Sequence, residues 1–249
     1  MYIGFELKKF NKNFFDYFDY YLNIGNEIFI KHKRIIQKTL NQFEKNDGSL
    51  NGDKMQSNWF PKINTDVFLC HSHSDKDLVI AFAGWLKDNF DLEVFVDSCI
   101  WGYYKDLQKL IDNRYSKNPQ RGLDYDNVLF AASHVNMMLN TALMQMIDNC
   151  ECVIFINTPN SVKPNEVVNK IISPWIYSEL AMTKLITKKS LQSHRVDYIN
   201  ESKVFSELQI EYNLDTKHLC DLSTGDLSRW EGISLKKYNA LDYLYKMKS

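Results

Sequence analysis

Alternating strand and helix patterns from residue 66 onward predict an α/β fold built on a mainly parallel sheet. Three short apolar runs have the length and composition of strands, and they span residues 66–70, 92–97 and 152–157. Between them, apolar residues recur at helical spacing over 77–89 and 135–147. The run at 152–157 is apolar almost throughout, which is typical of a strand covered by helices on both sides.

The connections after the three strands are the natural place for a site, because ligands of open α/β sheets bind at the carboxyl ends of the strands. These connections are a polar turn at 71–76, an aromatic-rich loop at 98–104 and a longer loop at 158–172. A short helix at 105–115 and an irregular polar stretch up to Asp126 precede the amphipathic helix. Near the end of the chain we expect short strands at 208–212 and 218–222 and a closing helix at 235–247.

The chain before residue 66 predicts two helices and a linker. Aromatic residues recur at helical spacing within 1–45, Gly25 suggests a break, and a second helix is expected at 26–44. The polar, glycine-containing segment 45–58 is typical of a linker, so the chain divides into an N-terminal helical segment, 1–58, and a main domain, 59–249. The helical segment has two possible roles: a hairpin packed on the main domain, or an oligomerisation element.

Composition narrows the class of protein. The 249 residues are 45% hydrophobic, and 30 basic against 31 acidic side chains give a net charge of −1, which favours neither nucleic acid nor an anionic membrane as a partner. No apolar run reaches membrane-spanning length, and the first residues lack the apolar core of a signal peptide, so we expect a cytoplasmic protein. The five cysteines are scattered and odd in number, which suits free thiols in a reducing compartment.

Several common chemistries lack their motifs. The sequence has no dinucleotide-binding G-x-G-x-x-G, no phosphate-binding P-loop, no H-E-x-x-H zinc motif and no G-x-S-x-G elbow. The cysteine and histidine pairs are not at zinc-site spacing, so a metal site is the minor interpretation. A nucleophilic Cys70 with His71 or His73 stays open, although Cys70 is better explained as the end of a buried strand.

The helix predicted at 174–187 carries one carboxylate in an unusual place. Ser173 suits an N-cap and Pro174 the first helical position. On one stripe of this helix Glu179 lies among apolar residues, namely Trp175, Met182 and Ile186, and the opposite side is also mostly apolar. We therefore expect the helix to lie between layers and Glu179 to serve either in an ion pair or in the chemistry of a site.

Three segments in order resemble Toll/interleukin-1 receptor (TIR) domains. Residues 66–76, DVFLCHSHSDK, resemble the first strand and turn of that family, and 92–97 resemble its second strand. Residues 175–180, WIYSEL, resemble the W-x-x-x-E helix start of its enzymatic members. The resemblance covers about 66–186 and implies a flavodoxin-like, five-stranded sheet with helices on both faces.

The resemblance also implies site residues. Glu179 matches the catalytic glutamate and Trp175 the indole one turn before it. Tyr104, with Tyr103 beside it, falls where the family places an aromatic near the base. The turn residues that fall at the ligand are His71, Ser72 and His73. The chain departs from the family pattern at Cys70, which replaces a serine, in the second-strand loop, which lacks a proline, and at 113–128, which looks inserted.

Enzymatic members of this family cleave the nicotinamide–ribosyl bond of NAD+, so the resemblance implies NAD+ as a substrate and no separate cofactor. It further implies a role in antiphage immunity, assembly into a homo-oligomer or filament, and a separate effector protein that responds to an ADP-ribose product. Two other classes stay open: a non-enzymatic TIR scaffold that acts by homotypic assembly, and a sensor that binds a nucleotide without turnover. Core or loop packing is the preferred explanation for Trp101 and the alternative explanation for Trp175 and Tyr104.

Overall fold

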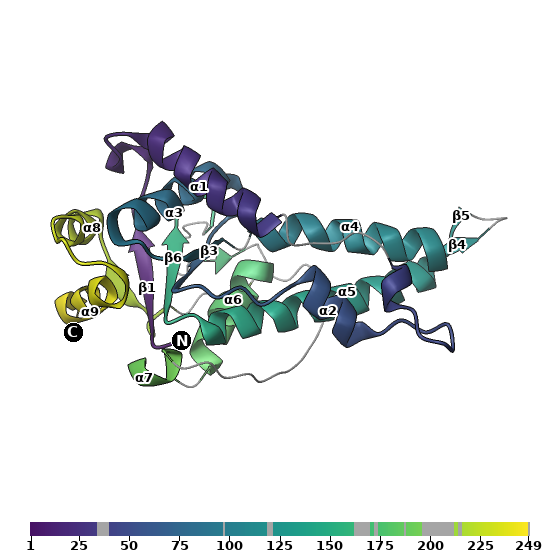
Figure 1. Cartoon of the computed structure of the whole chain (residues 1–249). Coiled ribbons are helices and arrows are strands. Elements are labelled where there is room, and N and C mark those ends of the chain that lie inside the picture. Colours follow the sequence, from purple (N-terminus) through teal and green to yellow (C-terminus); the bar gives the residue numbers. More distant parts are fainter. Residues whose placement is uncertain are drawn as a thin grey trace.

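The computed structural model contains a five-stranded, fully parallel sheet with the strand order β3-β2-β6-β1-β9 (Figure 1). The structure describes residues 1–33, 40–96, 98–118, 122–161, 170–171, 174–186, 188–195, 212–213 and 216–248. The strands of the sheet are β1 (Ile3–Lys8), β2 (Val67–Cys70), β3 (Val94–Val96), β6 (Cys152–Asn157) and β9 (Cys220–Leu222). The predicted α/β architecture, flavodoxin-like with a mainly parallel sheet, is confirmed.

Helices cover both faces of the sheet. One face packs against α2 (Gly52–Trp59), α4 (Ser98–Tyr115), α5 (Tyr125–Asn149) and α6 (Pro174–Leu185). The other face packs against α1 (Phe18–Lys33), α3 (Lys76–Phe90), α8 (Thr224–Glu231) and α9 (Lys237–Lys248). Shorter elements are η1 (Lys12–Phe14), η2 (Asn41–Phe43), η3 (His73–Asp75), α7 (Leu191–His194), and the two-residue strand pairs β4–β5 (Lys117–Asn118, Gly122–Leu123) and β7–β8 (Lys170–Ile171, Tyr212–Asn213).

The two core clusters follow from the alternation of side chains along each strand. In β2, Phe68 and Cys70 point into the cluster under α5 and α6, whereas Val67 and Leu69 point into the cluster under α3. All four are fully buried. A strand buried on both faces needs apolar residues at consecutive positions, which is why the continuous apolar runs predicted the central strands correctly.

Residues 3–8 form the strand β1, so the prediction of a helix there was wrong. β1 lies between β6 and β9, and its register pairs Phe5 with Ile154 and with Cys220. The physical reason is visible in the segment itself: Ile3, Phe5 and Leu7 alternate with Gly4, Glu6 and Lys8, which is strand periodicity. Segments on both sides of residue 58 therefore share one sheet.

The strands fill the places of a flavodoxin-like sheet, but they follow one another along the chain in a different order. Counted from β2, the strands β2, β3 and β6 occupy the first, second and third places of the 2-1-3-4-5 arrangement, and β9 occupies the fifth. The fourth place is taken by β1, the earliest strand of the chain. The strand order reverses between β2 and β6, so the ligand-binding crevice of this topology lies at their carboxyl ends.

Gly25 does not break a helix, contrary to the prediction. It lies inside α1, where that helix crosses α3 at Gly84. A Cβ atom at Gly25 would lie 1.9 Å from the carbonyl oxygen of Ile80, and one at Gly84 would lie 2.0 Å from the carbonyl oxygen of Tyr21. The two glycines allow the helix backbones to touch. The predicted second helix at 26–44 is in part the continuation of α1 to Lys33, while residues 34–39 lie outside the described residues.

Two segments predicted as irregular are helical. The expected linker at 45–58 includes most of α2, whose N-cap Asn51 accepts a hydrogen bond from the backbone of Lys54 and whose Met55 and Trp59 are buried in the core. The expected loop at 98–104 is the beginning of α4. Polar composition misled the first prediction, and Gly102 together with the aromatic residues misled the second.

The C-terminal third agrees with the prediction in part. A strand, β9, lies within the predicted 218–222, and α9 matches the predicted closing helix to within a few residues. The helix α8 was not predicted. Of the segment predicted as a strand at 208–212, all but Tyr212 lies outside the described residues. Within the described part of the chain, every helix is too short or too polar to cross a bilayer.

Candidate functional site

The helix α6 starts at the carboxyl edge of the sheet, where a ligand of this topology would bind. It follows β6 in the chain, and just beyond its far end the backbone of Lys189 donates a hydrogen bond of 3.2 Å to the carbonyl oxygen of Met1, which lies at the amino end of β1. The helix therefore runs antiparallel to the strands. Trp175, in its first turn, lies toward the carboxyl edge. The proposed N-cap Ser173 lies outside the described residues.

Glu179 is buried within the layers, as the sequence pattern predicted. Only 1% of its surface is exposed, and its neighbours on the helix, Ile176 and Leu180, are core residues. The other members of the predicted stripe are partly buried and pack against the same core cluster: Trp175, Met182 and Ile186. The far side is less covered than expected, because Leu185 is 77% exposed.

Two aromatic residues predicted for the site, Trp175 on α6 and Tyr104 on α4, are in contact. Their ring centroids lie 5.8 Å apart with an interplanar angle of 50°. Both rings are partly buried against the core cluster under α6. Two segments that are about 70 residues apart in the sequence thus meet one helical turn from Glu179. The side chains of Tyr103 and Trp101 lie outside the described residues.

The three residues of the turn after β2 that were predicted to contact a ligand differ in their exposure. His71 is buried, with 2% of its surface exposed, Ser72 is half-buried and His73 is exposed at the start of η3. Of the three residues that the sequence assigned to a ligand, His73 has the surroundings of an ordinary solvated turn. His71 directly follows Cys70, which faces the same core cluster as Ile176 and Leu180 of α6.

A polar cluster that the sequence did not predict joins the ends of β2 and β6. The carboxylate of Asp75 accepts a hydrogen bond of 2.5 Å from the Thr158 hydroxyl and one of 2.7 Å from the Asn160 side-chain amide. The Ser161 hydroxyl donates to the carbonyl oxygen of Ile156 at 3.1 Å. Asp75, Thr158 and Ser161 are buried. The cluster fixes two turns at the point where the strand order reverses. Its signal in the sequence is a polar run directly after each of the two strands.

A second polar cluster lies at the carboxyl ends of β1, β6 and β9. The buried carboxylate of Glu6 accepts a hydrogen bond of 2.6 Å from the Asn157 side chain and pairs with Lys8 at 3.2 Å. Lys8 also pairs with Asp221 at 2.6 Å. These contacts were not predictable while residues 3–8 were assigned to a helix.

The thiols near the sheet are unsuited to nucleophilic or metal chemistry. Cys70, Cys150 and Cys152 are fully buried. Burial raises the pKa of the Cys150 thiol to about 12 and that of Cys152 well above its ordinary value, which keeps both protonated at neutral pH. Among the residues that the structure describes, no three histidine, cysteine, aspartate or glutamate side chains come together as a metal-binding group.

Chemically, the described residues offer a buried carboxylate and, one turn earlier on the same helix, an indole ring in contact with a phenol ring. A search of protein-family models, of curated proteins and of solved structures found no match to this chain.

Proposed function

We propose that this chain cleaves the nicotinamide–ribosyl bond of NAD+ and so releases nicotinamide together with ADP-ribose or a cyclic or modified ADP-ribose. The observation that carries the proposal is the contact between Trp175 and Tyr104, one helical turn from the buried Glu179. The resemblance of these segments to TIR domains adds the setting, which is a signal-producing or NAD+-depleting role in antiphage immunity.

The reaction suits a single carboxylate. As the bond between ribose C1 and the pyridinium nitrogen breaks, its electron pair neutralises the nitrogen, so nicotinamide leaves without needing a proton. The ribose carbon becomes positively charged and oxocarbenium-like, and a nearby carboxylate stabilises that charge. Water then adds to C1 and loses a proton to give ADP-ribose, or a nucleophilic atom of the ADP-ribose itself adds to give a cyclic product. Glu179 is the residue to which we assign charge stabilisation.

The aromatic pair suits the remainder of the substrate. Flat rings stack on bases, and a cationic pyridinium is attracted to the face of an indole or phenol ring. Trp175 and Tyr104 are partly buried. Each ring packs against the core on one side and keeps some surface that a ligand can reach. We assign both residues to substrate positioning.

The burial of Glu179 has a consequence for the rate. A carboxylate in surroundings of low polarity interacts more strongly with a developing positive charge than one in water. With 1% of Glu179 exposed, however, the substrate reaches the carboxylate only after neighbouring segments move apart. We therefore expect slow basal turnover by the dilute protein, and faster turnover once assembly or a trigger favours the open arrangement.

The test is nicotinamide release from NAD+ by purified protein over a range of protein concentrations, with and without a crowding agent. Glu179→Gln keeps the shape of the side chain and removes its charge. Glu27→Gln makes the same change at an exposed position of α1 and serves as the control. We expect release by the wild type and by Glu27→Gln and at least a hundredfold loss in Glu179→Gln (about 3 kcal/mol of transition-state stabilisation). Thermal unfolding of all three proteins should agree to within about 4 °C.

Equal release by Glu179→Gln, or no release by the wild type under any of these conditions, would overturn the proposal. In the second case, binding of NAD+ without turnover would favour the sensor, and self-assembly without binding would favour the scaffold. A Glu179→Gln protein that unfolds would identify Glu179 as a structural residue. Where release occurs, chromatography of the ADP-ribose product separates hydrolysis from cyclisation.

A further inference from the structure

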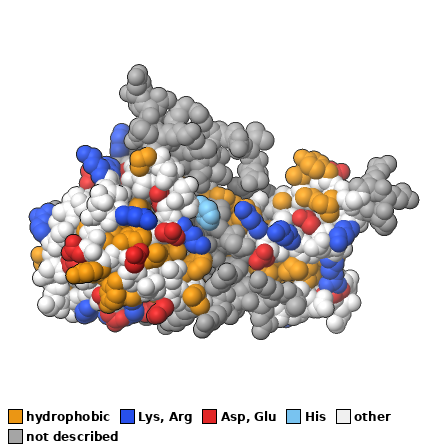
Figure 2. Space-filling model, turned by 90° about the horizontal axis from the view of Figure 1, so that it is seen from above, with side chains coloured by type: hydrophobic (Ala, Val, Ile, Leu, Met, Phe, Trp, Pro, Cys, Tyr) orange, Lys and Arg blue, Asp and Glu red, His pale blue; other side chains and the backbone are white. Residues whose placement is uncertain are grey.

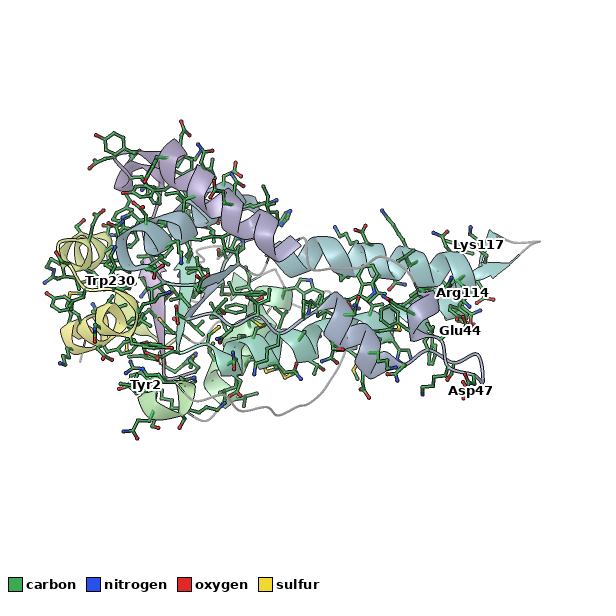
Figure 3. The ribbon with its side chains drawn as sticks, viewed as in Figure 1. Tyr2, Glu44, Asp47, Arg114, Lys117 and Trp230 are labelled. Atoms are coloured by element: carbon green, nitrogen blue, oxygen red, sulfur yellow. The ribbon has the colours of Figure 1, made fainter. Side chains whose placement is uncertain are left out.

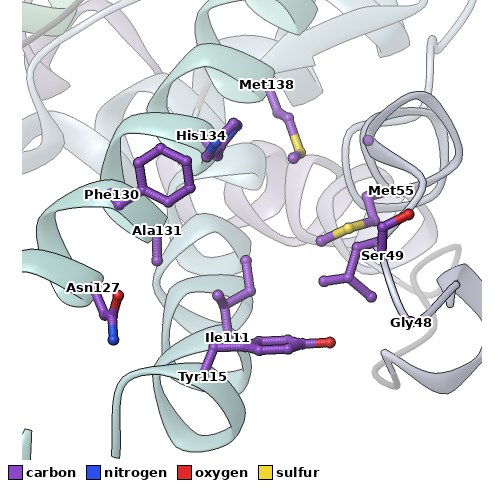
Figure 4. Close-up of a pocket in the computed structure, with 12 residues that line it drawn as sticks. Gly48, Ser49, Met55, Ile111, Tyr115, Asn127, Phe130, Ala131, His134 and Met138 are labelled. Carbon is purple, nitrogen blue, oxygen red and sulfur yellow. The ribbon is translucent and has the colours of Figure 1, made fainter. Parts of the chain in front are cut away.

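A pocket lies between α4 and α5 on one side and the turn before α2 on the other (Figure 4). The described residues that line it are distant in the sequence from Glu179. Helices α4 and α5 extend side by side away from the sheet and end at the β4–β5 hairpin; we call this pair of helices the arm (Figure 1). The pocket has a volume of about 630 Å³. Pockets that hold small molecules commonly have volumes of roughly 300–1,000 Å³.

The pocket has a buried apolar floor and an exposed aromatic rim. Met55, Ile111 and Ala131 form the floor and are at most 8% exposed. Phe130 and Tyr115 line the pocket nearer to solvent, with 67% and 41% of their surfaces exposed. In the space-filling view, hydrophobic side chains lie among charged ones along the arm (Figure 2). Large exposed rings over an apolar floor are unusual for a surface that stays in contact with water.

Among the described residues that line the pocket, none carries a carboxylate, ammonium or guanidinium group. The polar side chains among these residues are Ser49, Tyr115, Asn127 and His134, and the ring centroids of His134 and Phe130 lie 4.6 Å apart at an interplanar angle of 81°. A charged ligand would lose its hydration on entering this pocket, and no oppositely charged side chain of the described lining would compensate for that loss. The chemistry of the lining therefore favours an uncharged ligand and disfavours NAD+, whose two phosphates need cationic or backbone N–H partners.

The wall formed by the chain between η2 and α2 is held in place before any ligand arrives. Arg114 of α4 pairs with Glu44 at 2.5 Å and donates a hydrogen bond to Asn41 at 3.1 Å (Figure 3). Within the turn, the backbone and hydroxyl of Ser49 both donate to the Asp47 carboxylate. Gly48 lies in the left-handed region at φ = 80°, which a side chain would strain. A preformed wall reduces the entropy lost on binding.

We propose that this pocket is a binding site for an uncharged, mostly apolar small molecule that contains a ring system and carries one or two polar atoms. The rings pack between the floor and Phe130, and the polar atoms face Asn127 and His134 at the rim. The enclosed floor favours a small molecule over a second protein, because a flat protein surface would leave the depth of the pocket empty. The site is separate from the one assigned to NAD+ and does not depend on that function.

A matched pair of fluorescent probes tests the proposal. N-phenyl-1-naphthylamine is uncharged, and 8-anilino-1-naphthalenesulfonate has the same ring system with a sulfonate added. We expect one N-phenyl-1-naphthylamine molecule to bind per chain, and the sulfonate to bind at least tenfold more weakly. Phe130→Ala removes the exposed ring and Met138→Trp fills another part of the pocket; each should weaken binding about tenfold, the effect of roughly 1.4 kcal/mol. Tyr125→Ala removes an equally exposed ring of α5 that does not line the pocket and should leave affinity within about twofold.

Thermal unfolding should show that all three variants fold, because Phe130 and Tyr125 are exposed and Met138 is only partly buried. Equal binding of the two probes, several probes per chain, or unchanged affinity in both Phe130→Ala and Met138→Trp would overturn the proposal and indicate nonspecific apolar surface. One probe per two chains, with dimers seen by analytical ultracentrifugation, would overturn it in favour of an interface between copies of the chain.

Discussion

At the scale of single residues, the crossing of α1 and α3 depends on two glycines, which have no side chain. Gly25 and Gly84 let α1 and α3 touch through their backbones. A glycine inside a helix costs about 1 kcal/mol relative to alanine, so local preference alone would favour alanine at both positions. The crossing reverses that preference, because carbonyl oxygens of the facing helix occupy the space that a methyl group would need.

We therefore predict that Gly25→Ala and Gly84→Ala each lower the free energy of unfolding by at least about 2 kcal/mol, since a clash with backbone cannot be relieved by rotating a side chain. Urea unfolding followed by circular dichroism measures the loss. Gly52→Ala is the matched control: it also replaces a helical glycine, nothing lies within 4 Å of the added carbon, and it should be neutral or stabilising. Wild-type midpoints for both crossing variants would show that the two helices do not meet there.

Sequence reasoning found part of the site and missed part for a physical reason. Glu179 and Trp175 lie one turn apart on the same helix, and such pairs can be read from spacing. The sequence placed Trp175 on a helix and Tyr104 in a loop of the same site, without knowledge that Tyr104 belongs to a helix that contacts Trp175. The hydrogen bonds of Asp75 with Thr158 and Asn160 depend on β2 and β6 being neighbours, and no local pattern encodes the order of strands in a sheet.

At the scale of elements, α8 illustrates how a short helix is stabilised at its first turn. Ser223 and Asp226 form a capping box, in which each side chain bonds to the backbone N–H of the other residue. Burial raises the pKa of Asp226, but hydrogen bonds from Ser223 and Lys248 outweigh burial and lower the pKa to about 2. The carboxylate is thus held in its charged form.

Removing the cap should destabilise the protein. We predict that Ser223→Ala lowers the free energy of unfolding by about 1 kcal/mol, because one or more N–H groups at the helix start lose their partner. Ser228→Ala, at an exposed position inside the same helix, should have no effect or stabilise slightly, since alanine has the higher helix propensity. Equal unfolding free energies for the two variants, measured in urea, would show that the Ser223 cap does not stabilise α8.

The Asp226 carboxylate also predicts a pH dependence. Its pKa is lower in the folded protein than in the unfolded chain, so its contribution to stability is complete above the ordinary value of 3.8 and is lost as pH falls toward 2. We predict that the stability of the wild type falls more steeply from pH 4 to pH 2 than that of Asp226→Asn, which has no carboxylate to protonate at this position. Urea unfolding at several pH values compares the two slopes, and parallel curves would contradict the assignment.

Elements with a clean period were predictable, and elements whose pattern was mixed were not. The apolar runs of β2 and β6 and the spacing of α3 and α5 predicted those elements to within a few residues. β1 was missed because the helical spacing of the aromatic residues after it dominates the region, although Ile3, Phe5 and Leu7 carry a strand signal. α2 is mostly polar and is stabilised by the burial of Met55 and Trp59, which only the tertiary structure reveals.

One helix serves both sites that we infer. α4 carries Tyr104, which contacts Trp175, and seven residues later Ile111, which forms part of the pocket floor. Seven residues of helix span only about 10 Å. An apolar ligand in the pocket would therefore contact the same helix that holds the Tyr104 ring against Trp175.

At the scale of the whole molecule, β1 joins the edge strand β9 to the rest of the sheet. It pairs with β6 along six residues and with β9 along three. We predict that backbone amides of β1 exchange with deuterium as slowly as those of β6, because neither strand can open without exposing both core clusters. Mass spectrometry of peptides from the two strands measures the rates, with the exposed turn at 45–49 as the fast reference. Exchange of β1 at the rate of that turn would show that the strand is only loosely attached.

The position of β1 also bears on synthesis. β1 leaves the ribosome well before its neighbour β6, which is complete only when the chain reaches Asn157. At a synthesis rate of about 5–20 residues per second, roughly 150 further residues take about 7–30 s. During that interval an apolar strand with both edges unpaired is exposed to other chains and to chaperones. β1 therefore cannot pair with β6 until about 150 further residues have been synthesised.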